Sequence, residues 1–166
     1  QEQEAAFLSI HSRGPGLKIT GVNKELLQER SIIRSWLMRG TLHLFATDDI
    51  DWLLPLLAPI FIKKNLRRYK ELGLDEASIH RGVQIIREQL ASHSPMTRHE
   101  LAHGLLRQAV NTRGQALIYL INRAAWEGVL CLGPQIGGKQ TYAYLPDWIG
   151  RSLRDGPASR AHWARS

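Results

Sequence analysis

Residues 77 to 145 carry three helical patterns followed by two β-prone runs, and this order constrains the fold more than any other feature of the chain. The first pattern has apolar residues at spacings of four, three and four, which is the buried stripe of an amphipathic helix. The members of this stripe are Ile79, Val83, Ile86 and Leu90. The pattern predicts a mainly α fold in which a small β-hairpin follows the helices.

The second and third helices have recognisable ends. Thr97 and Glu100 predict a capping box, in which the threonine hydroxyl covers a first-turn amide and the glutamate reaches back to the threonine amide. The third helix is expected to start at Asn111 or Thr112 and to stop at Gly128, because glycine readily takes the left-handed conformation of a C-cap. Its expected core residues are Leu117, Leu120, Ile121 and Ala124.

Two short β-prone runs, residues 129–132 and 141–145, follow with a glycine-rich stretch between them and predict a hairpin. Three helices and a hairpin in this order are typical of a winged helix, a helix-turn-helix variant whose hairpin is called the wing. We therefore expect an N-terminal helical unit over residues 1–74 and a winged-helix domain over residues 75–148. Residues 149–166 are expected to be a basic tail or the start of a truncated further domain.

The N-terminal unit contains weaker signals. We expect a helix over residues 4–12, a helix capped by Asn23 that runs to residue 29, and a strand over residues 40–45, where apolar and polar residues alternate. Pro55 and Pro59 interrupt the apolar residues 50–62, which favours short packed helices there. A basic helix is expected over residues 61–72.

Charge and cysteine content narrow the choice of partner. The 22 Lys and Arg residues exceed the 15 Asp and Glu residues, so the formal charge is +7, and double-stranded DNA is the first partner to consider.

Cys131 is the single cysteine, which excludes an internal disulfide and a cysteine-based zinc site. A single cysteine fits a reducing setting, and no apolar stretch is long enough to span a membrane, so we expect a cytoplasmic protein. We also expect no cofactor. The start at Gln1 without a methionine suggests a fragment.

The third helix is the first place to expect base contacts, because the later helix of a helix-turn-helix unit enters the major groove. The face opposite its core carries Thr112, Gln115, Tyr119, Asn122 and Trp126, with Arg113 and Arg123 beside it. Amide side chains can pair with adenine, and guanidinium groups can pair with guanine or phosphate. The alternative is that the two aromatic residues pack against a neighbouring unit while the polar residues face water.

The hairpin tip and the basic helix offer further DNA contacts. Gly137 and Gly138 leave backbone amides unobstructed, and Lys139 supplies a cation, which suits the approach to a phosphate. The cations of a basic helix usually form a charged face in contact with solvent. The alternative is that they contact phosphates. The cations of that helix are Lys63, Lys64, Arg67, Arg68 and Lys70.

A zinc hydrolase is a further alternative. His99, Glu100 and His103 match the spacing in which two histidines hold zinc and a glutamate activates water. The capping box already explains Glu100, and the sequence suggests no third ligand. We therefore rank this alternative below DNA binding and expect no metal site.

The string from Arg34 to Leu44, with Arg-Gly-Thr-Leu-His at its centre, resembles a signature of the AlkZ-like DNA glycosylases. Residues 128–134 and 141–145 look like the first wing of the same family. The resemblance implies a bacterial enzyme of tandem winged helices that excises alkylated bases and, in some members, unhooks crosslinks. It also implies a catalytic motif of glutamine, an apolar residue and then glutamine or aspartate, whose last position falls on Gln1. A non-catalytic DNA-binding or regulatory module is the alternative.

Arg39 and His43 belong to this string. In an extended segment they would share a polar face with Thr41, while Leu42 and Leu44 point to the core. A cleft that holds a damaged nucleotide could use Arg39 on a phosphate and His43 as a hydrogen-bond donor. Alternatively, the histidine satisfies a buried carbonyl and the arginine pairs with an acid.

Overall fold

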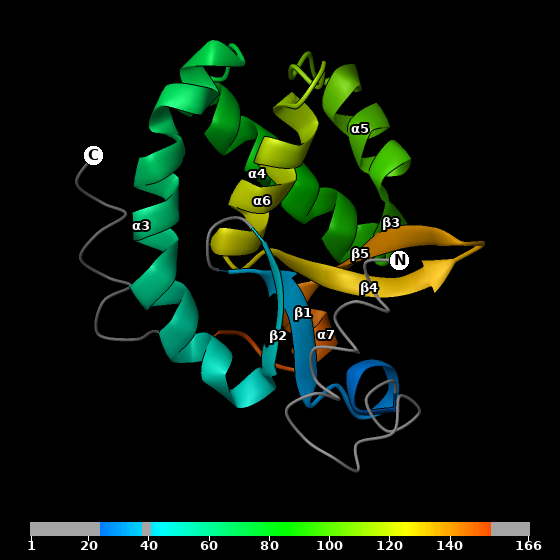
Figure 1. Ribbon diagram of the computed structural model, residues 1–166. Helices are drawn as coiled ribbons and strands as arrows, with labels where there is room; N and C mark the ends of the chain where they lie inside the picture. The colour runs from blue at the N-terminus through cyan, green and yellow to red at the C-terminus, as the bar shows by residue number, and fades with distance from the viewer. Residues whose placement is uncertain (1–23, 38–40, 154–166) are drawn as a thin grey trace.

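The computed structural model describes residues 24–37 and 41–153, and it combines helices with two small antiparallel sheets (Figure 1). The prediction of a mainly α fold with a small β component is confirmed at this level. The helix expected over residues 4–12 and the Asn23 cap lie outside the described residues. In chain order the elements are η1 (Glu25–Glu29), β1 (Ile32–Trp36), β2 (Leu42–Ala46), η3 (Thr47–Asp49), α3 (Ile50–Glu71), α4 (Glu76–His93), β3 (Met96–Thr97), α5 (Arg98–Arg107), α6 (Ala116–Trp126), β4 (Leu130–Ile136), β5 (Lys139–Tyr144) and α7 (Leu145–Ile149).

The N-terminal unit is not purely helical, because β1 and β2 pair in antiparallel fashion, with Ile33 opposite Phe45 and Trp36 opposite Leu42. The alternation over residues 40–45 correctly predicts β2. β1 gives no such signal, since its residues 33–36 are buried in succession, without the alternation of a half-exposed strand. The helix expected to end at residue 29 is a single π-helical turn, η1, which Arg30 closes with φ of 54°.

The prediction of short helices around Pro55 and Pro59 is wrong, because both prolines lie inside α3, a continuous helix of 22 residues. Each proline removes one backbone hydrogen bond and disfavours a helix interior. The burial of one side of α3 opposes that cost. Its buried residues are Ile50, Leu54, Ala58, Phe61 and Tyr69.

Helices α4 and α5 form where the sequence predicts them. The Asp75 side chain accepts a hydrogen bond from the Ser78 amide at the start of α4, and the predicted apolar stripe of α4 is buried. The capping box of α5 is confirmed: the Glu100 amide donates to the Thr97 hydroxyl, and the Thr97 amide donates to the Glu100 carboxylate at 2.6 Å.

Helix α6 starts later than expected, at Ala116, because Asn111 organises the preceding loop instead of capping the helix. The Asn111 side chain donates to the Leu72 carbonyl at 2.9 Å and accepts from the Arg113 amide at 3.0 Å. The predicted core residues of α6 are buried, and Gly128 follows the helix with φ of 70°, as a glycine C-cap requires.

The predicted hairpin is present as β4 and β5, which extend farther into the glycine-rich stretch than expected. Ile136 pairs with Lys139 across a turn made of Gly137 and Gly138, whose φ angles are 57° and 74°. The short strand β3 pairs with the other edge of β5, giving the sheet order β3-β5-β4. Two residues are too few to give β3 a detectable pattern.

The larger hydrophobic cluster contains residues from both sides of position 74. Trp36, Tyr69 and Leu74 pack in it with apolar residues of α4, α5 and α6. A second cluster joins Ile33 of β1 to residues of α3, the hairpin and α7. The segments before and after residue 74 therefore share one core. None of the helices in the described part of the chain is long and apolar enough to cross a bilayer.

Candidate nucleic-acid interface

Helix α3 packs against α6 and covers much of the face that was expected to be open. The Trp126 ring stacks on Phe61 with centroids 6.0 Å apart, and Tyr119 meets Tyr69 edge-on at 6.0 Å. Trp126 is only 3% exposed. The structure therefore shows the second of the two alternatives: both aromatic residues pack against a neighbouring element.

Arg123 also occupies a buried position rather than the expected open one. Its side chain is 7% exposed, and its guanidinium lies 3.0 Å from Glu76 and 2.5 Å from Glu127. Burial on its own would lower the pKa of Arg123, but Glu127 and then Glu76 outweigh burial and raise it. The observed contacts join α4 to α6, so the side chain is engaged inside the protein. Asn122, next to it, is half-buried, and its Oδ1 is shielded from solvent.

The N-terminal end of α6 remains open, because Arg113 and Gln115 are exposed there. Arg68 of α3 donates through Nη2 to Gln115 Oε1 at 2.7 Å, so the end of the basic helix and the start of α6 lie side by side. The N-terminal residues of a recognition helix are the ones that reach base edges. We name this surface the α3–α6 edge and define it by its polar side chains Lys63, Lys64, Arg67, Arg68, Lys70, Arg113 and Gln115.

Part of the positive charge on the α3–α6 edge is neutralised within α3. Arg67 Nε lies 2.9 Å from Glu71 Oε1, and Arg68 Nη1 lies 2.8 Å from Glu71 Oε2. Hydrogen bonds from Arg68 and then Arg67 lower the pKa of Glu71. In the part of the chain that the structure describes, the other cations of the edge form no ion pair, so they can neutralise an external anion.

Lys139 is exposed at the tip of the hairpin, on the first residue after the Gly137–Gly138 turn. Lys139 acts electrostatically on Glu100 at the start of α5. The Thr97 amide and hydroxyl lower the pKa of Glu100, and the positive charges of His99 and Lys139 add to this effect. The sequence therefore placed this lysine correctly on an exposed hairpin tip.

His43 lies on β2 opposite Ser35 of β1, and its Nε2 is 2.9 Å from the Thr41 hydroxyl. The two polar side chains share one side of the strand, as the alternation predicts, and His43 is half-buried. Arg39, the third residue expected on this face, lies outside the described residues, as does Gln1.

Sequence reasoning missed a contact between Arg34 and Gln140. Arg34 is buried in β1 and donates to the Gln140 side chain of β5, while Gln140 Nε2 donates to backbone carbonyls on both strands of the hairpin at 2.9 and 2.7 Å. Trp36 stacks on Tyr142 in the same region, with centroids 6.0 Å apart. These contacts fasten β1 to the hairpin. An arginine within a run of buried residues was the available signal, since a buried guanidinium needs a partner.

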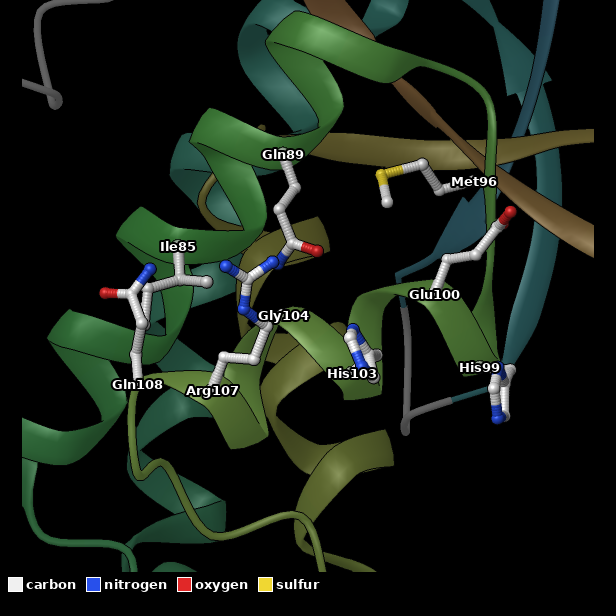
Figure 2. A pocket seen from close by; sticks show the side chains of 9 residues that line it. All are labelled: Ile85, Gln89, Met96, His99, Glu100, His103, Gly104, Arg107 and Gln108. Carbon is white, nitrogen blue, oxygen red and sulfur yellow. The ribbon is translucent and has the colours of Figure 1, made fainter.

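An open pocket of about 560 Å³ lies between α4 and α5 and was not predicted (Figure 2). Gln89 crosses α5 at Gly104, where an added Cβ would come 2.1 Å from Gln89 Oε1, so the glycine makes room for the amide. His103 and Arg107 also line the pocket. The Gln89 amide, the His103 imidazole and the Arg107 guanidinium can donate hydrogen bonds, and the Glu100 carboxylate also lines the pocket.

The zinc hypothesis gains no support from the same region. The Thr97 amide and hydroxyl donate to Glu100 at 2.6 and 2.7 Å, and the Glu100 carboxylate points away from the imidazoles of His99 and His103 (Figure 2). Within residues 24–37 and 41–153, no group of three or more His, Cys, Asp or Glu side chains could hold a metal ion. A catalytic zinc site needs three protein ligands.

Comparisons with known proteins identify the family of this chain. The model of the family described as DNA glycosylase AlkZ-like matches residues 1–166, so the chain belongs to this family of DNA glycosylases. A curated relative, the interstrand DNA cross-link repair glycosylase of Streptomyces sahachiroi, is 29% identical over 161 residues. That alignment covers 90% of this chain and 41% of the relative.

A solved structure shares the fold. The Streptomyces sahachiroi DNA glycosylase AlkZ superposes with a TM-score of 0.74 at 24% identity, over 89% of this chain and 40% of that one. The chain therefore spans about two fifths of the length of both relatives. The family resemblance noted in the sequence is confirmed.

Proposed function

We propose that residues 75–148 form a winged helix that binds double-stranded DNA, as part of an enzyme that removes alkylated bases. The element order α4-β3-α5-α6-β4-β5 supports the winged helix, since it supplies three helices, a short strand between the first two, and a hairpin. A cytoplasmic location fits the single, buried and unpaired Cys131.

The observation that carries the DNA-binding proposal is the contact between Arg68 and Gln115. It joins the basic part of α3 to the N-terminal end of α6, two segments that were separate candidates in the sequence. DNA would meet the start of α6, with Arg113 and Gln115 toward the bases and the lysines of α3 toward phosphates. The rest of α6 packs against α3 and would hold this end of the helix in position.

The excision proposal rests on membership in the glycosylase family and on the name of the curated relative, which acts in repair of interstrand crosslinks. We assign His43, Arg39 and Gln1 to the part of the protein that handles the damaged nucleotide. A non-catalytic DNA-binding or regulatory module remains the second candidate, and it would bind DNA without releasing a base.

Salt-dependent binding tests the DNA proposal. Five exposed cations, Lys63, Lys64, Lys70, Arg113 and Lys139, would neutralise phosphates, and at about 0.9 per phosphate the log-log slope is expected near −4.5. Fluorescence anisotropy with a labelled 20-base-pair duplex, about two helical turns, measures this slope. A slope near zero would contradict the proposal.

A pair of lysine variants locates the contact. Lys139→Ala is expected to reduce the slope by about one unit. Lys24→Ala is the matched control and should leave the slope unchanged, because Lys24 is exposed next to η1 and already pairs with Glu29 at 2.6 Å. Equal slopes for Lys139→Ala and the wild type would remove the hairpin from the interface.

Base release tests the excision proposal. His43→Ala should lower release from an alkylated duplex while the melting temperature stays unchanged, and His80→Ala, an exposed histidine on α4, should change neither quantity. A fall in melting temperature that matches the loss of activity would make His43 structural. DNA binding by the wild type without any base release would favour the non-catalytic module.

A further inference from the structure

The tip of the β4–β5 hairpin presents one large apolar side chain to solvent. Ile136 is 53% exposed and ends β4 directly opposite Lys139. Figure 1 shows the hairpin extending beyond the helices, so the tip is a projecting part of the molecule. Exposed isoleucine at such a position costs solubility without adding to the core.

The turn beside Ile136 is free of bulk. An ideal Cβ built on Gly137 or Gly138 would meet no atom within 4 Å, and both residues have positive φ. Two glycines therefore give a thin edge with no side chain, flanked by one apolar and one cationic residue. Residues 130–144 contain no Asp or Glu, so nothing on the hairpin itself repels a phosphate.

The hairpin is braced close to its tip. The Thr141 hydroxyl donates to the Pro134 carbonyl at 2.5 Å, and Gln140 bonds to backbone carbonyls on both strands. The buried Arg34 of β1 donates to Gln140 from outside the hairpin. A tip held in this way loses little conformational freedom on binding, and the β-branched side chain of Ile136 has few rotamers to lose.

We propose that Ile136 is an apolar wedge that inserts between neighbouring base pairs from the minor groove while Lys139 contacts an adjacent phosphate. Isoleucine is among the side chains that proteins use to unstack a base step in this way, and the unstacking kinks the duplex. The bare Gly137–Gly138 turn would let the hairpin edge enter a groove of about 6 Å width. This inference rests on the proposed DNA binding and names how one part of the same interface acts.

A duplex with 2-aminopurine at an A·T-rich step provides the test, since the fluorescence of this base rises when it is unstacked. Wild-type protein is expected to raise the signal, and Ile136→Ala to abolish the rise and weaken binding by about tenfold to a hundredfold, the loss expected for one buried aliphatic side chain. Ile136→Met should restore both, because methionine can also act as a wedge. The salt slope should be the same for all three proteins.

Two further variants separate the wedge from its neighbours. Lys139→Ala should lower the salt slope by about one unit and leave the fluorescence rise intact. Leu56→Ala removes an aliphatic side chain of similar size and 58% exposure from α3, and it should change neither readout. A shared loss of affinity in Leu56→Ala and Ile136→Ala would overturn the wedge assignment.

The outcomes distinguish the two proposals. Tight, salt-dependent binding without any fluorescence rise, or with a rise that persists in Ile136→Ala, would overturn the wedge and leave DNA binding intact. Absence of binding by the wild-type protein would overturn the proposed function itself.

Discussion

Replacement of Arg123 by methionine separates a structural role from a DNA-binding role on the same helix. The variant keeps an unbranched apolar stem and removes the charge, which leaves Glu127, 20% exposed, and Glu76, 66% exposed, without their partner. Loss of one member of a fully buried pair costs about 3–5 kcal/mol. Because Glu76 faces solvent and Glu127 can turn toward it, we expect about 2–3 kcal/mol for Arg123→Met.

Thermal unfolding measures that cost. For a chain of this size, about 2–4 °C of melting temperature corresponds to each kcal/mol, so Arg123→Met should melt about 5–10 °C lower than the wild type. At 15 °C the variant should remain folded and bind DNA with wild-type affinity and salt slope.

Arg113→Ala is the matched control, in the loop just before the open N-terminal end of the same helix. Arg113 is exposed, so its removal should change stability by less than about 0.5 kcal/mol and reduce the salt slope by about one unit. The reasoning would be refuted by an Arg123→Met protein that melts like the wild type and binds DNA more weakly.

Four further predictions follow from individual contacts. Thr97→Ala removes the capping box and should cost about 1 kcal/mol in the free energy of unfolding, measured by urea denaturation. Folding lowers the pKa of Glu100 below 4.5, chiefly through the Thr97 amide, so this stabilisation is complete above pH 4.5 and is lost as the pH falls through the folded value. Glu100→Gln should therefore flatten the acid side of a plot of melting temperature against pH. Gly128→Ala places a Cβ 2.3 Å from Leu153 at φ of 70°, and it should lower stability by about 1–2 kcal/mol or more. Burial strongly raises the pKa of the Cys131 thiol, so the native protein should resist a thiol reagent that labels the urea-unfolded chain at once.

The local signals in the sequence were sufficient to predict α4, α5 and the β4–β5 hairpin. The stripe from Ile79 to Leu90 has the helical period, and Thr97 with Glu100 has the spacing of a capping box at a helix start. Gly137 and Gly138 lie between two β-prone runs and give the turn of the hairpin. Each of these features depends on neighbours a few residues away, which a sequence displays directly.

The packing of α3 on α6 could not be predicted in the same way, because α3 is distant from α6 in the sequence. One signal was available: α6 reads ALIYLINRAAW and is apolar almost all round, and such a helix is buried on several sides. The sequence left open whether Tyr119 and Trp126 face DNA or pack against a neighbouring unit, and in the structure both have aromatic partners.

The prolines of α3 misled for a different reason. Local propensity disfavours a helix through Pro55 and Pro59, but the apolar side of α3 continues across both and packs in the core. This long helix then places its basic end beside α6, so the α3–α6 edge depends on tertiary packing that local patterns do not contain.

Site-directed photo-crosslinking tests the central claim, that DNA meets the start of α6 beside the basic end of α3. Since Cys131 is buried, a cysteine introduced at Gln115 can be labelled selectively with an azidophenacyl group. Gln28→Cys is the matched control, because Gln28 is exposed on η1, the blue turn at the bottom of Figure 1. The proposed interface predicts a crosslink to duplex DNA from position 115 that salt suppresses, and little from position 28. Equal crosslinking from both positions, or crosslinking from position 28 alone, would contradict it.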